Sequence, residues 1–193
     1  MTTSNSGPSK SGPNLLPPQD KPNLTPRLMV LDSELDNICL ELARRERDER
    51  IRYFIPHGGQ SEFINVLTEP GGFITISGAG NGWGKSEFMV ALFAAVMWPN
   101  LAPPCFASQP ALMAWKHPKR GRIYSKPAEL EEIGSLQSAI VKLFPKGRYI
   151  SSKGRYSYPN TFKTDTGWIL DLFSYERDES EAAGPNIGLQ GFN

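Results

Sequence analysis

The sequence contains few of the residues that form disulfide frameworks or Cys/His metal sites. Among its 193 residues, only Cys39 and Cys105 are cysteines, and only His57 and His117 are histidines. No CxxC pair is present. This composition argues against a small disulfide-stapled protein and against a zinc site built from cysteine and histidine. We therefore expect a protein of a reducing compartment.

Long apolar runs and a net charge of one sign are also missing. The most apolar segment, residues 88–98, is far shorter than the roughly 20 residues of a membrane span. The start of the chain lacks the basic and apolar regions of a signal peptide. Lys and Arg number 21 and Asp and Glu 20, so the total charge does not indicate a nucleic-acid binder. We expect a soluble intracellular protein with no membrane contact.

The first 27 residues differ in composition from the rest of the chain. They are rich in Pro, Ser, Thr and Asn, and beyond Met1 only Leu15, Leu16 and Leu24 are large apolar residues. Burial of so few apolar groups cannot offset the conformational entropy lost on folding. The sequence predicts a disordered arm over residues 1–27 and one folded region over residues 28–193.

Hydrophobic periodicity predicts helices alternating with strands in the folded region. One helix is expected over residues 33–50, with Asp32 or Ser33 as N-cap. The other helices are predicted over residues 60–67, 85–98 and 127–144, the last with an apolar face of Leu130, Ile133, Leu136, Ile140, Val141 and Leu143. Strands are predicted over residues 73–77, 121–125, 148–152, 160–163 and 168–174, and a further strand begins in 186–193. The repeated strand–helix order is typical of an α/β fold with a mainly parallel sheet.

A glycine-rich loop lies between the predicted strand 73–77 and the apolar helix that begins at Lys85. Its sequence is Ala79-Gly80-Asn81-Gly82-Trp83-Gly84-Lys85-Ser86. Glycines at 80, 82 and 84 permit the positive φ angles with which a backbone wraps around an anion. The loop is similar to a phosphate-binding loop, with Ala79 where the strict pattern has glycine.

The residue types of this loop match the chemistry of ATP and Mg²⁺. The backbone amides would surround the β-phosphate, Lys85 would stabilise charge on the transferred phosphoryl group, and the Ser86 hydroxyl would bind Mg²⁺. A purely structural glycine turn is the alternative. The strand before the loop and the apolar helix after it favour the nucleotide-binding interpretation.

The loop and the residues before it resemble the large terminase subunit of tailed bacteriophages, the ATPase of DNA packaging. The likeness extends over about residues 53–193, and its sharpest part runs from Gly80 through Asn81, Gly82 and Trp83 to Ser86. An aromatic-Pro stretch with Gln60 precedes the loop by about twenty residues, as in that family. The resemblance implies that Gln60 contacts the adenine; the alternative is a surface residue at a helix start.

The terminase resemblance carries further expectations about fold, function and location. It implies a P-loop NTPase of the RecA-like type that couples ATP hydrolysis to packaging of double-stranded DNA into procapsids. It implies contacts with other terminase subunits and the portal or procapsid, in the cytoplasm of the infected bacterial host. A helicase or other RecA-like motor, and a non-catalytic DNA-binding assembly protein, are the alternative functions.

A motor ATPase also needs an acidic motif at the end of an apolar strand to hold Mg²⁺ and orient water. The segment 167–171 ends in Asp171, but Leu172 follows it where the motif has an acid. We expect these acids beyond residue 193, so that the ATPase domain is incomplete at its C-terminus. Asp171 as the metal ligand is the alternative. On this interpretation the isolated chain binds nucleotide weakly and hydrolyses it poorly.

Charge is unevenly distributed along the sequence. Residues 116–163 contain 11 Lys or Arg and 3 Asp or Glu, whereas residues 164–193 contain 1 and 6. Tyrosines are interleaved with the basic residues, and Trp115 directly precedes the segment. Such a segment can follow a phosphate backbone without reading bases, which favours contact with DNA. A solvated basic face, or an arginine that acts on a neighbouring subunit, would explain the same pattern.

Overall fold

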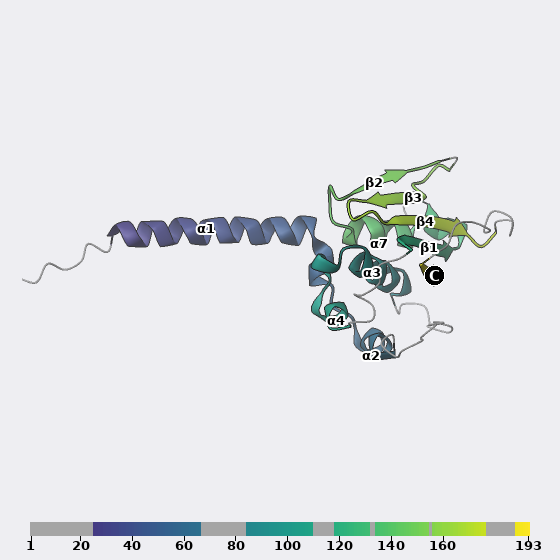
Figure 1. The fold of residues 1–193 in the computed structure, drawn as a ribbon, viewed down its shortest axis with the longest axis horizontal. Helices are drawn as coiled ribbons and strands as arrows, with labels where there is room; N and C mark the ends of the chain where they lie inside the picture. The colour runs from purple at the N-terminus through teal and green to yellow at the C-terminus, as the bar shows by residue number, and fades with distance from the viewer. Residues whose placement is uncertain (1–24, 67–83, 110–117, 132–133, 155, 177–187) are drawn as a thin grey trace, which may run out of the picture. The chain divides into compact units, whose positions relative to one another are not determined.

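The computed structural model describes residues 25–66, 84–109, 118–131, 134–154, 156–176 and 188–193. The chain divides into two units, Met1–Cys39 and Leu40–Asn193. The second unit contains the sheet and its helices (Figure 1). The predicted strand 73–77 and the first 24 residues of the predicted arm lie outside the described ranges.

Helices and strands alternate along the chain as the periodicity predicts. The helical segments are α1 (Thr25–Asp48), η1 (Arg50–Tyr53), α2 (Gly58–Val66), α3 (Lys85–Met97), η2 (Pro99–Leu101), α4 (Pro104–Ala107), α6 (Pro127–Leu130) and α7 (Ser135–Leu143). The strands are β1 (Arg120–Ser125), β2 (Tyr149–Ser152), β3 (Thr161–Thr164), β4 (Ile169–Ser174) and β5 (Leu189–Phe192). All five strands overlap the ranges predicted for them.

The five strands form one mixed sheet in the order β2-β3-β4-β1-β5. Strand β1 pairs in parallel with β4 on one side and with β5 on the other. Strands β2, β3 and β4 pair antiparallel, and the described residues between them form no crossover helix. The α/β class and the parallel centre are confirmed, and the antiparallel side makes the sheet mixed.

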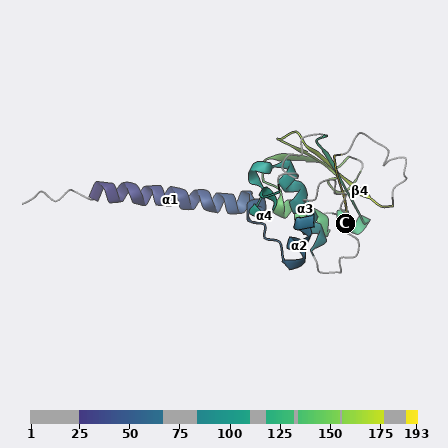
Figure 2. The same ribbon diagram turned by 60° about the horizontal axis from the view of Figure 1, so that its bottom comes forward.

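Helix α3 packs on one face of the sheet at close range, where two neighbouring strands carry glycine. A Cβ atom at Gly121 would lie 2.9 Å from the Phe93 ring, and one at Gly191 would lie 2.6 Å from the Met89 sulfur. In Figure 2, α2, α3 and α4 lie below the fanned strands. The absence of side chains at the two glycines lets the helix backbone approach β1 and β5.

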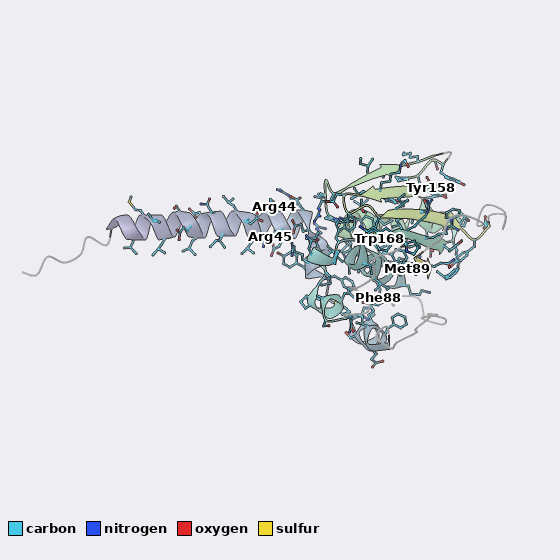
Figure 3. The ribbon with its side chains drawn as sticks, viewed as in Figure 1. Arg44, Arg45, Phe88, Met89, Tyr158 and Trp168 are labelled. Atoms are coloured by element: carbon cyan, nitrogen blue, oxygen red, sulfur yellow. The ribbon has the colours of Figure 1, made fainter. Side chains whose placement is uncertain are left out.

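The hydrophobic core surrounds α3 on several sides. Nine of its thirteen residues are buried, as the nearly unbroken apolar sequence predicts. Phe88 contacts the rings of Phe54, Phe63 and Phe106, on the side of α3 next to α2 and α4. Figure 3 labels Phe88 on that side and Met89 nearer the sheet. The helix therefore connects the sheet with the smaller helices.

Two predicted helices differ from the observed ones. Helix α1 begins at Thr25, eight residues before the predicted start, because Pro26 is tolerated in a first turn where its missing N–H is not needed. Ser33 lies inside this helix, and its hydroxyl donates to the carbonyl of Val30 at 2.9 Å instead of capping the helix. Neither Asp32 nor Ser33 is therefore the N-cap.

The predicted helix 127–144 is two helices, α6 and α7. The backbone is extended at Glu131 and at Gly134, so the helix ends and restarts. A Cβ atom at Gly134 would lie 2.3 Å from the carbonyl oxygen of Glu129, so only glycine fits where the chain folds back. Val141 is 67% exposed and does not belong to the buried face, which in α7 consists of Leu136, Gln137, Ala139, Ile140 and Leu143. Ile133 lies outside the described residues.

A polar junction joins the end of α3 to the β3–β4 turn. The fully buried Trp98 donates its ring N–H to Asp165 at 2.7 Å, and Thr166 donates its hydroxyl to the carbonyl of Met97 at 2.7 Å. Arg148 forms an ion pair with Asp165 at 2.6 Å. Burial alone would raise the pKa of Asp165, but the hydrogen bonds from Arg148 and Trp98 hold it below its usual value.

We predict that Asp165→Ala destabilises the protein by about 2 kcal/mol at neutral pH, because the buried Trp98 N–H loses its acceptor. Since folding lowers the pKa of Asp165, its stabilising effect is present above the usual carboxyl pKa and is lost as pH falls below it. Thermal unfolding between pH 6 and pH 2 tests both statements. Asp165→Asn keeps an acceptor for Trp98, so it should lower the free energy of unfolding by less than half as much as Asp165→Ala does. An equal loss in the two variants would assign the stabilisation to the ion pair with Arg148.

Candidate functional site

The structure describes three residues of the predicted phosphate-binding loop: Gly84, Lys85 and Ser86. The predicted ligands Gly80, Asn81, Gly82 and Trp83 lie outside the described residues, and their role stays a prediction. Lys85 and Ser86 form the first turn of α3 and are both partly exposed. Among described partners, Lys85 makes no ion pair.

Gly84 has the left-handed backbone conformation that favours glycine. Its φ is 72° and its ψ is 33°, and it stands immediately before α3 as the N-cap. Its carbonyl accepts the Phe88 N–H at 2.9 Å, which closes the first turn of the helix. The positive φ predicted for the loop glycines is confirmed at this position. The thirteen-residue helix presents its positive dipole end at the loop.

Gln60 lies beside Gly84 although 24 residues separate the two in the sequence. Only 3% of its surface is exposed. Its amide nitrogen donates to the Gly84 carbonyl at 3.4 Å, and its amide oxygen accepts the backbone N–H of His57 at 3.3 Å. The alternative of a surface residue at a helix start is therefore wrong. His57 itself is exposed, just before α2, as a turn residue would be.

The Ser86 hydroxyl contacts two further elements. It donates to the side-chain oxygen of Asn193 at 2.9 Å and lies 3.1 Å from the Ser135 hydroxyl at the start of α7. Asn193 follows β5, and its backbone N–H donates to the Tyr124 carbonyl at 2.8 Å. The start of α3, the start of α7 and the end of β5 therefore meet at Ser86.

A second group of hydrogen bonds continues from Asn193 to β1 and α6. The Asn193 amide nitrogen donates to the Ser125 hydroxyl at 3.1 Å and to the Glu129 carboxylate at 2.9 Å. Ser125 also donates to Glu129. Tyr175 donates its hydroxyl to the Asn193 carbonyl at 2.8 Å. Partial burial and the charge of Glu129 raise the pKa of Tyr175 above its usual value.

Sequence reasoning missed Ser125, Glu129, Ser135 and Asn193. Ser125 and Asn193 stand at the carboxyl ends of two parallel strands, and in open α/β sheets ligands bind at such ends. That rule could have indicated both residues once the strand pairing was known. Glu129 gave no signal, because the predicted continuous helix 127–144 left it as an ordinary helix-surface carboxylate.

A hollow of about 270 Å³ lies between the start of α3 and α7. It is lined by Gly84, Ser86, Glu87, Ser135, Ser138, Ala139 and Lys142. Two of these lining residues, Lys142 and Glu87, form an ion pair at 2.6 Å. The hollow places a serine hydroxyl and the end of a helix dipole next to open space, which suits an anion or a hydrated cation.

Asp171 does not join this group. It alternates with the buried Leu170 and Leu172, so it points to the sheet face opposite the one that α3 covers. Its carboxylate pairs with Arg120 at 2.6 Å and accepts the Thr161 hydroxyl at 3.1 Å. Across the described ranges, no cluster of three or more His, Cys, Asp or Glu side chains is present.

Most basic side chains of the segment 116–163 that are described have partners. Four form ion pairs with carboxylates from neighbouring segments: Arg120 with Asp171, Lys142 with Glu87, Lys146 with Asp48, and Arg148 with Asp165. Arg122 is buried with its guanidinium 4.2 Å from the centre of the Phe173 ring. The tertiary structure therefore removes much of the charge contrast seen along the sequence, and DNA contact stays a prediction.

Comparisons with protein families, with curated proteins and with solved structures found no match. No helix in the described part of the chain has the length and apolar character needed to cross a membrane. The functional interpretation therefore rests on the residues that meet at the start of α3.

We predict that Gly84→Ala destabilises the protein by about 1–2 kcal/mol, because an L-residue is strained at a φ of 72°. The added Cβ would also lie 3.1 Å from the Gln60 amide nitrogen. Urea unfolding measures the loss. Gly58→Ala is the matched control, since nothing lies within 4 Å of a Cβ there and its φ is not in the left-handed range. Equal effects of the two substitutions would contradict the strain at Gly84.

Proposed function

We propose that this chain is the ATP-binding part of a motor of the terminase large-subunit type. In this proposal, a P-loop NTPase domain of the RecA-like type couples ATP hydrolysis to the packaging of double-stranded DNA into procapsids. Its partners are other terminase subunits and the portal or procapsid, in the cytoplasm of an infected bacterial host. The sequence from Gly80 to Ser86 and the terminase resemblance suggest this activity.

The observation that carries the proposal is the contact of Gln60 with Gly84, the residue that starts the helix whose first turn contains Ser86. A residue suggested for adenine and a residue suggested for Mg²⁺ come from distant parts of the sequence, and both lie at one helix end. The left-handed Gly84 starts this helix, and its dipole favours a phosphate group there. These features support a nucleotide site better than a merely structural turn.

The residues present suit ATP and Mg²⁺ by their chemistry. Mg²⁺ prefers oxygen ligands, and the Ser86 hydroxyl is a neutral oxygen ligand at the edge of the hollow. Bound Mg²⁺ would neutralise charge on the β- and γ-phosphates. Lys85 would stabilise the same charge, and the loop amides would orient the polyphosphate. Gln60 would bind the adenine edge.

We predict that Lys85→Ala weakens binding of ATP with Mg²⁺ at least tenfold, because the ammonium group no longer attracts the phosphates. Isothermal titration calorimetry of the chain measures this. Lys142→Ala is the matched control: it removes an ammonium that lines the hollow beside Ser86 and is already paired with Glu87, and it should change affinity less than threefold.

Two results of that titration would reject parts of the proposal. If the unchanged chain releases no heat with ATP and Mg²⁺, the alternative of a non-catalytic DNA-binding assembly protein remains. Equal affinity of the Lys85→Ala variant would contradict the role proposed for Lys85.

A separate measurement of ATP turnover tests Asp171. Rapid turnover by the unchanged chain that is abolished by Asp171→Asn would contradict a purely structural role of Asp171 in its pair with Arg120 and would identify Asp171 as the catalytic acid.

We predict that Gln60→Met lowers the preference for ATP over GTP by about tenfold, because the thioether keeps the length of the side chain but forms no hydrogen bonds with a base edge. Competition of each nucleotide with a fluorescent ATP analogue measures the preference. Ser61→Ala, in the next position of α2, is the control. An unchanged preference with intact folding would restrict Gln60 to its contact with Gly84.

A further inference from the structure

The hydroxyl of Ser86 has a defined direction in the structure. A serine hydroxyl has one hydrogen and two lone pairs. The side-chain oxygen of Asn193, 2.9 Å away, can only accept, so Ser86 donates its one hydrogen there. Ser135, 3.1 Å away, must then be the donor in its contact with Ser86. One lone pair of the Ser86 oxygen remains for a further ligand.

The orientation of the Asn193 amide is set by its other partners. Its nitrogen donates to the Ser125 hydroxyl and to the Glu129 carboxylate. An ionised carboxylate can accept hydrogen bonds but cannot donate them. A flipped amide would place its oxygen against that carboxylate and its nitrogen against the Ser86 hydroxyl. Glu129 therefore keeps the amide oxygen facing Ser86.

These hydrogen bonds form a chain with one direction. Ser86 donates to Asn193, Asn193 donates to Ser125 and Glu129, and Ser125 donates to Glu129. Hydrogen bonds in such a chain polarise one another, and the negative charge of Glu129 increases electron density toward the Ser86 oxygen. An oxygen polarised in this way is a better ligand for a hard cation.

Asn193 is also held by its backbone. Its N–H donates to the Tyr124 carbonyl, and its carbonyl accepts the Tyr175 hydroxyl, both at 2.8 Å. Its position directly after β5, which is parallel to β1, sets it level with Ser125. The side chain therefore has little freedom to move away from Ser86.

We propose that Asn193, oriented by Glu129, is a positioning residue that presents the Ser86 hydroxyl oxygen to Mg²⁺ in the nucleotide site. This inference rests on the proposed function, because it assigns the residues that prepare the metal ligand of that site. Asn193 and Glu129 act through Ser86 and need no contact of their own with the nucleotide.

The test measures the gain in ATP affinity that Mg²⁺ supplies, as the ratio of affinities in Mg²⁺ and in EDTA. Asn193→Leu and Glu129→Leu should each reduce this gain about tenfold, in the range typical of residues that orient metal ligands. Affinity in EDTA should stay the same. Glu129→Gln keeps an acceptor oxygen but removes the negative charge, so it should reduce the gain less than Glu129→Leu does. Glu131→Leu, which changes an exposed carboxylate of the same region, should retain the full gain.

A double-mutant cycle shows whether Asn193 acts through Ser86. In a Ser86→Ala background, Asn193→Leu should cause no further loss of the Mg²⁺-dependent gain. Thermal unfolding of each variant detects any general loss of structure. The same loss in both backgrounds, or a gain that survives Asn193→Leu, would overturn the positioning role while ATP binding stands. Absence of ATP binding by the unchanged chain in both buffers would overturn the proposed function and this inference together.

Discussion

The close approach of α3 to β1 and β5 sets the position of the candidate site in the second unit. Gly121 and Gly191 leave space for Phe93 and Met89, so at these two positions the helix side chains rest directly on the backbone of β1 and β5. Its apolar surface is buried against the sheet on one side and against the aromatic cluster around Phe88 on the other. Because the helix is fixed on these strands, its first turn is fixed at their carboxyl ends. That placement brings a helix dipole and the ends of two parallel strands to one point.

The polar groups at that point form a directed arrangement. Three hydroxyl or amide groups donate in sequence toward Glu129, and the Ser86 oxygen stands at the other end of the chain. Partly buried polar groups are costly when they lack partners, so a satisfied network of this kind holds its members in one geometry. Gln60 adds a second contact at the start of α3 through the Gly84 carbonyl. The start of α3 is therefore held by side chains from α2 and by the residue that follows β5.

Charge illustrates how folding changes the meaning of a sequence pattern. The basic segment 116–163 and the acidic segment that follows it are distinct along the chain, yet strand pairing places Arg120 beside Asp171 and Arg148 beside Asp165. Opposite charges 2.6 Å apart neutralise each other. The difference in charge between the two sequence segments therefore overstates the basic surface of the folded protein. The same pairing places Asp171 away from Ser86, although its position after an apolar run resembles that of a metal-binding acid.

Local patterns in the sequence determined the helices and strands. The apolar run after Lys85 predicted a buried helix, and the β-branched and aromatic runs predicted the strands. The glycine-rich loop predicted a positive φ, which is observed at Gly84. These features depend on propensity and periodicity within a few residues. Only the tertiary structure decided the mixed pairing of the sheet, the break at Gly134, the burial of Gln60 and the contact of Ser86 with Asn193, 107 residues away. Such contacts depend on which strands become neighbours, and strand order is a property of the whole sheet that no local window of sequence contains.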